Sequence, residues 1–380
     1  MKFVVAPDSF KESLTALAAA EAIRDGIRRV LPEADIDLVP MADGGEGLAQ
    51  TLTDALGGHL VDTACHDALG REIRGAVGYV PATRLAIIEM AAASGLALIA
   101  PGERDVARAS TRGTGELIAH ALDAGARRFI IGLGGSATND AGTGLLTALG
   151  VRFLDAAGAG LPPGGAALAD LAAVDASGLD PRFAGATIEI ACDVDNPLLG
   201  PRGASAVFGP QKGAAPAQVA RLDAALTRWA DVVEPTLGRA VRDLPGGGAA
   251  GGLGAGLAAF LPQAVLRRGI DIVVDAVRLR DRVRGADWVF TGEGGIDAQT
   301  SHGKTPYGVF QVAASAGVPV IMFGGRITPD AATLLDAGVT ALVPIVRGVT
   351  TLTEALAHGR ENLAAAAELT VRLLVARMAE

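Results

Sequence analysis

Acidic, glycine and small polar residues gather in five short loops, each of which directly follows an apolar run that reads as a strand. The residues of these loops that could bind a ligand or a proton are Asp8, Ser9 and Lys11; Asp43, Gly44, Gly45 and Glu46; Gly134, Gly135, Ser136, Thr138, Asn139 and Asp140; Asp193 and Asp195; and Glu293 and Asp297. Asp, Asn, Ser and Gly also form turns and helix caps, so any single loop has a purely structural explanation. Five loops of one kind at strand ends favour convergence on one site.

The chemistry that suits such loops is group transfer assisted by a metal ion. Clustered carboxylates without neighbouring His or Cys ligands suit Mg²⁺, which prefers oxygen donors. Basic side chains stand in similar loops, at Lys11, Arg202, Lys212 and Lys304, and could offset phosphate or carboxylate charge during transfer. Phosphoryl transfer needs a metal, cations, backbone N–H donors and one base. The residue types therefore predict a phosphoryl-transfer enzyme.

Two glycine-rich stretches stand out from the rest of the chain. Residues 127–144 begin as a buried strand, continue as a glycine-rich turn and run into a helix, an arrangement whose backbone N–H groups bind anions. Residues 245–256 are apolar and glycine-rich and also lead into a helix. Their composition leaves open whether they form a flexible linker or an active-site loop.

Familiar catalytic motifs are missing from the sequence. Gly303-Lys304-Thr305 looks like the end of a P-loop but lacks the preceding glycine at the required spacing. The sequence contains neither the protein-kinase motifs nor a nucleophile elbow. Gly132-Leu133-Gly134-Gly135 is a poor match to a dinucleotide fingerprint, so a dehydrogenase is disfavoured.

The elements that must position these loops follow an alternating order at both chain ends. Strand, loop and helix alternate in the first 60 residues and again from residue 286, which predicts a parallel sheet. Short strand-like runs between residues 60 and 90 read as a mixed or antiparallel segment. We therefore predict an α/β protein with a Rossmann-like domain from residues 1–60 and 285–380. A second, mixed α/β domain is inserted at 61–284, and the active site lies in the cleft between the two.

Composition narrows the class of protein. The net charge of −9 and an aromatic content of 4% argue against a nucleic-acid binder. Cys65 and Cys192 fit neither a zinc pattern nor a disulfide framework. No signal peptide is recognisable, and no uninterrupted apolar run reaches the ~18 residues that a membrane span needs. We expect a cytoplasmic protein without nucleic-acid or membrane partners, either a monomer or a homodimer.

Several of these segments resemble, in order and over nearly the whole chain, those of the bacterial type I glycerate kinases. The segments are 5–14 and 42–47, 132–140, 193–198 with 208–213, and 292–294 with Ile296-Asp297 and Gly303-Lys304. The resemblance implies ATP-dependent phosphorylation of D-glycerate with Mg²⁺. It implies 2-phosphoglycerate as the product, with 3-phosphoglycerate as the alternative, and a Rossmann-like domain beside a second α/β domain.

The chain departs from the family pattern at three positions. Gly295 stands where a basic residue is expected, so Lys304 or Arg326 would have to supply that charge. Leu48 replaces an expected Thr, and Ala141 replaces an expected glycine. None of the three changes the family that the chain resembles.

On the strength of the resemblance we assign roles to the loop residues. Asp193 is the expected base for the glycerate hydroxyl, assisted by Lys11 and Asp297 as catalytic residues. Metal ligands are expected among Asp195, Asp140 and Glu293. Substrate and phosphate contacts are expected from Asp8, Ser9, Asp43, Gly44, Gly45, Glu46, Gly134, Gly135, Ser136, Thr138, Asn139, Lys212 and Lys304. The Gly134–Asp140 turn and the Gly246–Gly256 loop are expected to shape the nucleotide region.

Other functions remain open at this stage. A kinase or phosphatase for another small hydroxy acid or sugar would use the same residue types. A non-catalytic sensor of nucleotide or glycerate is a further alternative, although an anion sensor gains little from so many carboxylates.

Overall fold

A computed structural model describes residues 1–376, which pack as two compact units. Unit 1 comprises Met1–Asp43, Gln50–Gly57 and the chain from Ile270 onward, and unit 2 comprises Gly44–Ala49 and Gly58–Gly269. Residues 270–284 were assigned to the inserted domain from sequence. They pack instead with unit 1, because Lys2 Nζ donates to the Arg282 carbonyl (3.0 Å) and Arg282 pairs with Asp37 (2.6 Å). An active site between the domains stays a prediction.

Unit 1 is built on a parallel sheet. Within the described residues its five strands run in the order β13-β12-β11-β1-β2. Their bounds are β1 (Lys2–Val5), β2 (Asp35–Leu38), β11 (Trp288–Ile296), β12 (Val320–Ile327) and β13 (Ala341–Pro344). The first and last parts of the chain thus share one sheet, as the alternating pattern predicted, and buried Phe3, Phe290 and Phe323 stack edge-on in its core.

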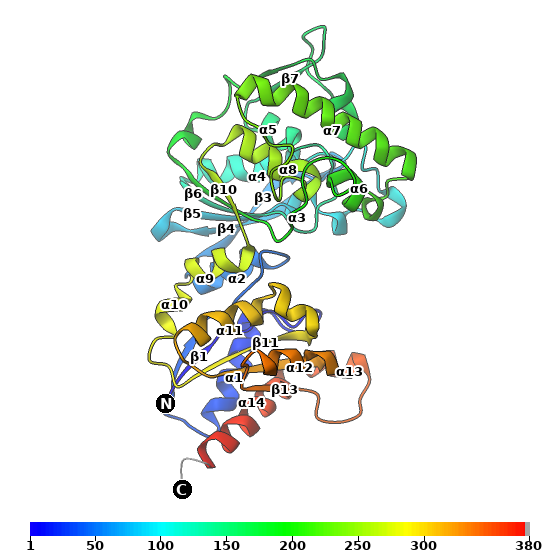
Figure 1. Cartoon of the computed structure of the whole chain (residues 1–380). Coiled ribbons are helices and arrows are strands. Elements are labelled where there is room, and N and C mark those ends of the chain that lie inside the picture. The colour runs from blue at the N-terminus through cyan, green and yellow to red at the C-terminus, as the bar shows by residue number, and fades with distance from the viewer. Residues whose placement is uncertain (377–380) are drawn as a thin grey trace. The chain divides into compact units, whose positions relative to one another are not determined.

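The following helices belong wholly or partly to unit 1, and two of them, one near each chain end, pack against each other. They are α1 (Ala16–Arg28), α2 (Leu48–Ala55), α9 (Gly269–Ala276), α10 (Leu279–Arg282), α11 (Thr305–Ser315), α12 (Ala332–Asp336), α13 (Leu352–Ala357) and α14 (Gly359–Ala376). Helices α1 and α14 lie side by side (Figure 1). A Cβ on Gly26 would come within 2.2 Å of the Ala364 carbonyl, so glycine is what allows this close approach.

Unit 2 contains a mixed sheet (Figure 1). In the described chain its strand order is β10-β9-β6-β5-β4-β3, with β10, β9, β6 and β5 parallel and the β3–β4–β5 meander antiparallel. The strands are β3 (His59–His66), β4 (Glu72–Val80), β5 (Leu85–Glu89), β6 (Arg128–Gly132), β9 (Thr187–Ala191) and β10 (Ala264–Arg267), besides a separate antiparallel pair, β7 (Arg152–Leu154) and β8 (Ala173–Asp175). The α/β class with parallel and mixed sheets is therefore confirmed.

The helices of unit 2 enclose a core of their own. They are α3 (Ala91–Ser94), α4 (Arg112–Asp123), α5 (Thr143–Ala148), α6 (Ala204–Phe208), α7 (Pro216–Leu237) and α8 (Ala249–Phe260). The apolar stripe of α7 packs Leu222, Leu226, Trp229 and Val233 into the interior. No helix in residues 1–376 combines the length and the apolar character needed to cross a membrane.

Candidate active site

The first group of site residues lies in unit 1, where β1 ends beside the middle of β11. Asp8 follows β1, and its N–H donates to the Gly292 carbonyl of β11 (2.9 Å). That bond brings Asp8 close to Glu293, the next residue of β11. Asp43 follows β2 on the other side of β1. We call Asp8, Asp43 and Glu293 the acidic cluster; their segments are neighbours because β1 pairs with β11 on one side and with β2 on the other.

Burial raises the proton affinity of two members of the acidic cluster. Burial raises the pKa of Asp8 to about 6, with a further contribution from the negative charge of Asp43 and an opposing one from the Thr305 hydroxyl. Burial likewise raises the pKa of Glu293 to about 7, opposed by Lys304 and Thr300. The protein thus supplies too little positive charge to stabilise both carboxylates, and a cation bound there would favour their ionised forms.

The start of α11 provides the donors around this cluster. The Thr305 hydroxyl donates to Asp8, and the Thr300 hydroxyl donates to Glu293 (3.0 Å). Lys304 Nζ lies 3.9 Å from Glu293 and 3.4 Å from Asp297. Lys304 therefore sits among the carboxylates and adds positive charge there.

The remaining predicted residues of unit 1 border this cluster. Ser9 donates its backbone N–H to Asp8 (2.6 Å). Lys11 is exposed, and its backbone N would be 3.4 Å from a Cβ on Gly294. Gly295 pairs in register with Arg326, which is exposed as well. Two cations, Lys11 and Arg326, are thus placed on segments that border the acidic cluster.

The second group lies in unit 2, where β5, β6, β9 and β10 end in one row. The last residue of each strand pairs in register with the last residue of the next strand: Glu89 with Gly132, Gly132 with Ala191, and Ala191 with Arg267. The Gly44–Gly45 segment packs onto this edge, because a Cβ on Gly132 would come within 2.9 Å of the Gly44 carbonyl. Parallel strands therefore gather Gly44, Gly45 and Gly134 at their carboxyl ends, where open sheets bind ligands.

Asp193 stands at the same edge, two residues beyond β9. Its Oδ1 accepts the Gly269 N–H (2.9 Å), and its Oδ2 would lie 3.5 Å from a Cβ on Gly44. The bond orients the carboxylate beside the glycine loop. Asp195 differs: its side chain is 81% exposed and pairs with Arg202 at 3.4 Å. That position fits a surface ion pair better than the predicted metal ligand, and Glu46 is exposed too.

Glu89 is a residue of this edge that the sequence analysis missed. Its two carboxylate oxygens accept the N–H groups of Ala49 (2.8 Å) and Gly47 (3.2 Å), at the start of α2. Burial raises its pKa. Glu89 thereby attaches the 44–49 segment to unit 2. Its signal was available, because it is an acid that ends the buried strand Leu85–Glu89, just as other candidate acids follow strands.

The glycine-rich turn after β6 divides into an exposed and a buried half. Gly134 and Gly135 are exposed, whereas Ser136, Thr138, Asn139 and Asp140 are buried. Asn139 Nδ2 donates to the Ser205 hydroxyl (3.0 Å). The backbone of Gly134 and Gly135 is therefore the part of the turn that could meet a phosphate, and the four polar side chains are engaged within the protein.

Asp140 holds this turn to the rest of unit 2. It is completely buried and accepts four hydrogen bonds, from the Thr111 N–H (2.8 Å) and hydroxyl (3.0 Å) and from the Gly142 (3.1 Å) and Gly144 (3.2 Å) N–H groups. Burial still raises its pKa. With its oxygens satisfied by the protein, Asp140 suits a structural anchor and not the metal ligand that was predicted.

The second glycine-rich stretch packs directly on this turn. Gly251, in α8, would place a Cβ 2.0 Å from the Thr138 carbonyl, and its own carbonyl accepts the Ala141 N–H (3.0 Å). Gly251 lies in a run of buried residues, so the stretch is no flexible linker. Ala141 has φ +51°, which explains why a glycine is expected at that position.

Lys212 is buried as well, at the end of the 3₁₀ turn Pro210–Lys212. Its Nζ donates to the Ser136 hydroxyl (2.7 Å) and the Thr138 carbonyl (2.7 Å). Burial lowers its pKa to about 7, opposed by the charge of Asp140. Lys212 therefore braces the buried half of the turn, and its ammonium group is engaged there and not exposed to a substrate.

Within residues 1–376 no group of three or more His, Cys, Asp or Glu side chains is arranged to hold a metal ion. Mg²⁺ in phosphoryl transfer is commonly held by one or two carboxylates together with substrate phosphates. Asp8 and Glu293 fit this requirement for one or two carboxylates, because neither charge is fully compensated by the protein.

Sequence comparison decides the family. The model of the glycerate kinase family matches residues 3–375. The chain belongs to the glycerate kinase family. Membership makes it a kinase that phosphorylates a hydroxyl group, and the family resemblance found in the motifs is confirmed.

Individual relatives agree with this over nearly their full lengths. A glycerate kinase of Bacillus subtilis is 52% identical over 363 residues, which are 96% of this chain and 95% of the relative. The glycerate 2-kinase of Escherichia coli is 45% identical over the same shares of both chains. A crystal structure assigned as glycerate kinase 2 from Salmonella typhimurium superposes with a TM-score of 0.93 at 48% identity, covering 100% of both chains.

Proposed function

We propose that this member of the glycerate kinase family transfers the terminal phosphoryl group of ATP to D-glycerate in a Mg²⁺-dependent reaction that forms 2-phosphoglycerate. The observation that carries the proposal is the match of its whole length to glycerate kinases, one of them a glycerate 2-kinase. The acidic cluster supports it, because the charge of Asp8 acts on Glu293 and Lys304 Nζ lies 3.9 Å from Glu293.

In the proposed reaction the metal site uses unit 1. Asp8 and Glu293 are the residues that would hold Mg²⁺, which when bound would neutralise charge on the transferring phosphate. Lys304 stays beside Glu293 and Asp297 and adds positive charge. Asp195 and Asp140, both predicted from sequence as ligands, are left out because one is exposed in an ion pair and the other is saturated with donors.

The base in the proposed reaction is Asp193. Asp193 is exposed, the Gly269 N–H orients its carboxylate, and Gly44 lies next to it. It accepts the proton of the glycerate hydroxyl that attacks phosphorus. The exposed backbone of Gly134 and Gly135 provides N–H donors for an anionic group, and Lys11 is available to meet the substrate carboxylate.

The test is an ADP-release assay with purified protein, D-glycerate, ATP and Mg²⁺, followed by addition of enolase. Enolase converts 2-phosphoglycerate but not 3-phosphoglycerate, so immediate enolase-dependent product formation is expected. ADP release without an enolase-competent product would assign the other hydroxyl. Absence of ADP release with D-glycerate, while another small hydroxy acid is phosphorylated, would overturn the substrate.

A further inference from the structure

A cavity of about 360 Å³ opens in unit 2, away from the strand ends just described. Its walls come from the β3–β4 turn (residues 66–70), from residues 103–112 at the start of α4, and from Pro163. Ligand cavities begin at about this size, and a molecule of a few carbon atoms would fit. We call it the α4 pocket.

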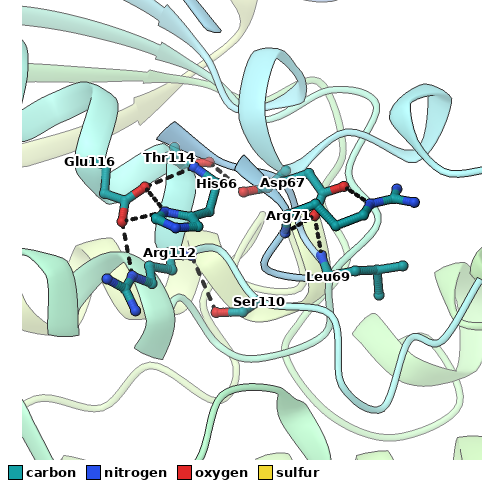
Figure 2. Close-up of polar contacts among 9 residues, drawn as sticks. His66, Asp67, Leu69, Arg71, Ser110, Arg112, Thr114 and Glu116 are labelled. Atoms are coloured by element: carbon teal, nitrogen blue, oxygen red, sulfur yellow. Dashed lines mark hydrogen bonds and ion pairs between the residues drawn. The ribbon is translucent and has the colours of Figure 1, made fainter. Parts of the chain in front are cut away.

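The walls of the α4 pocket are held by paired side chains (Figure 2). Asp67 is buried and accepts the Leu69 and Arg71 N–H groups, each at 2.9 Å, and pairs with the Arg71 guanidinium. His66 Nδ1 lies 2.9 Å from Glu116, which also accepts Arg112 Nε (2.9 Å). Most acids at the pocket are thus already matched by a partner.

Two arginines at the pocket keep donors that the protein does not use. Arg108 is exposed, and among the residues that the structure describes its guanidinium forms neither a hydrogen bond nor an ion pair. Arg112 engages Glu116 through Nε, which leaves its terminal nitrogens available. Ser110 is 5% exposed and its hydroxyl oxygen accepts the Arg112 N–H (3.2 Å). A carboxylate or phosphate would match these donors.

One acceptor at the pocket is also available. Asp105 Oδ1 accepts the Ala107 N–H (3.2 Å), and its other oxygen has no bond within residues 1–376. Glu103, by contrast, is engaged by Arg71 (3.0 Å). A ligand that combines an anionic group with a hydroxyl would therefore satisfy both sides of the pocket, the anion facing the arginines and the hydroxyl donating to Asp105.

We propose that the α4 pocket binds a small hydroxylated anion carrying a carboxylate or a phosphate. The proposed glycerate kinase function enters only in the choice of probes, because glycerate and phosphoglycerate have this chemistry. Ser110 and Arg112 flank Thr111, whose N–H and hydroxyl anchor Asp140. A ligand on Ser110 and Arg112 would thus be one residue away from the bonds that hold the glycine-rich turn.

The ring of His66 supplies a local probe, since His66 lines the pocket and the chain has 5 histidines. Protein labelled with ¹³C-histidine is titrated separately with D-glycerate, 2-phosphoglycerate and inorganic phosphate without ATP, and the H66Q variant assigns the His66 signal. We expect that signal to shift saturably with at least one of the three anions. The affinities of D-glycerate and inorganic phosphate separate carboxylate from phosphate recognition, since 2-phosphoglycerate carries both groups.

Arg108→Gln should weaken this binding at least about tenfold, which corresponds to about 1.4 kcal/mol. Arg128→Gln is the matched control, because Arg128 at the start of β6 is exposed and its side chain also has no partner among the described residues. The control should bind as the unmodified protein does, and circular dichroism should show both variants folded.

The absence of a saturable His66 shift with all three anions would overturn the proposal, and so would equal affinity of the two arginine variants. The kinase assay is read independently. A His66 shift without ADP release would reject the proposed function and support ligand binding by the α4 pocket. ADP release without a His66 shift would support the proposed function and reject ligand binding by the pocket.

Discussion

Single carboxylates in this chain differ sharply in what their surroundings allow. Asp140 and Asp193 both follow strands in loops of similar composition. Asp140 is buried and accepts four hydrogen bonds, whereas Asp193 is exposed and accepts the Gly269 N–H on one oxygen. The bonds of the first hold its loop in place, and the second is accessible to a bound molecule, as the proposed base requires. Residue type alone did not separate these roles.

Replacing the proposed base should abolish most of the turnover. We expect Asp193→Asn to lower kcat by roughly 10²-fold or more, the usual effect of losing a general base. The amide keeps the shape and can still accept the Gly269 N–H. Steady-state ADP release measures the change.

Asp195→Asn is the control for that variant, because the Asp195 side chain is 81% exposed and, within residues 1–376, its carboxylate pairs with Arg202 alone. It should keep nearly unchanged turnover. A folded Asp193→Asn protein with near-normal kcat would remove Asp193 from the role of base.

At the scale of elements, the two glycine-rich stretches form one packed unit. The turn after β6 and the start of α8 touch through backbone atoms, and Gly251 has φ +71° where the two meet. Lys212 adds a side-chain brace to the same turn from a third segment. The exposed Gly134–Gly135 backbone is therefore presented by a rigid support.

A side chain at position 251 should break this contact. Gly251→Ala would place its Cβ 2.0 Å from the Thr138 carbonyl in addition to the unfavourable φ. We expect a loss of at least about 3 kcal/mol in the free energy of unfolding, by overpacking and backbone strain together. Urea unfolding followed by circular dichroism measures it.

Gly158→Ala separates the two causes, since Gly158 has φ +80° but open space around its Cβ position. That variant should lose only about 1 kcal/mol, the cost of the left-handed conformation. Equal losses in the two variants would show that packing against Thr138 is unimportant.

At the scale of the molecule, each unit has its own core and its own tryptophan. The chain contains two, Trp229 inside unit 2 and Trp288 in β11 of unit 1. Proteins of several domains often depart from two-state unfolding. The tryptophans therefore allow the stability of unit 1 to be followed by itself in a Trp229→Phe background.

In that background the acidic cluster should make unit 1 less stable as pH rises. The pKa of Glu293 is raised from 4.5 to about 7 in the folded protein. The stability that the protonated carboxyl contributes to unit 1 is therefore fully present below pH 4.5 and is lost as pH rises through 7. At pH 8, Glu293→Gln should therefore raise the free energy of unfolding of unit 1 by about 2 kcal/mol relative to the protein with Glu293. At pH 4.5 the two proteins should be nearly equal in stability.

The measurement is urea unfolding followed by Trp288 fluorescence at both pH values, with EDTA present. Glu33→Gln, an exposed carboxylate of the same unit, should show no such difference between the two pH values. The stability gained through Glu293→Gln should be larger at pH 8 than at pH 4.5. A smaller gain at pH 8 would contradict the charge imbalance assigned to the cluster.

The sequence predicted the parts of the fold that local pattern encodes. Alternation of strands and helices at both chain ends predicted the parallel sheet of unit 1, and the stripe on α7 predicted its buried face. Residues 270–284 were misplaced because short helices carry little local information about which sheet they cover. The sequence offered Glu89 as an acid at the end of a buried strand, but its partners, the N–H groups of Gly47 and Ala49, were set by tertiary packing.

By itself, then, the sequence determined the fold class, the family, and which loops follow strands, since apolar periodicity and motif order are properties of the linear chain. Tertiary structure alone decided which loop residues face solvent and which are enclosed. Lys212 meets Ser136 across 76 positions, and Gly251 meets Thr138 through backbone atoms. Burial and pairing of this kind arise when distant segments pack, and they separate Asp193 and Glu293 from Asp140 and Lys212, whose polar groups hold the turn in place.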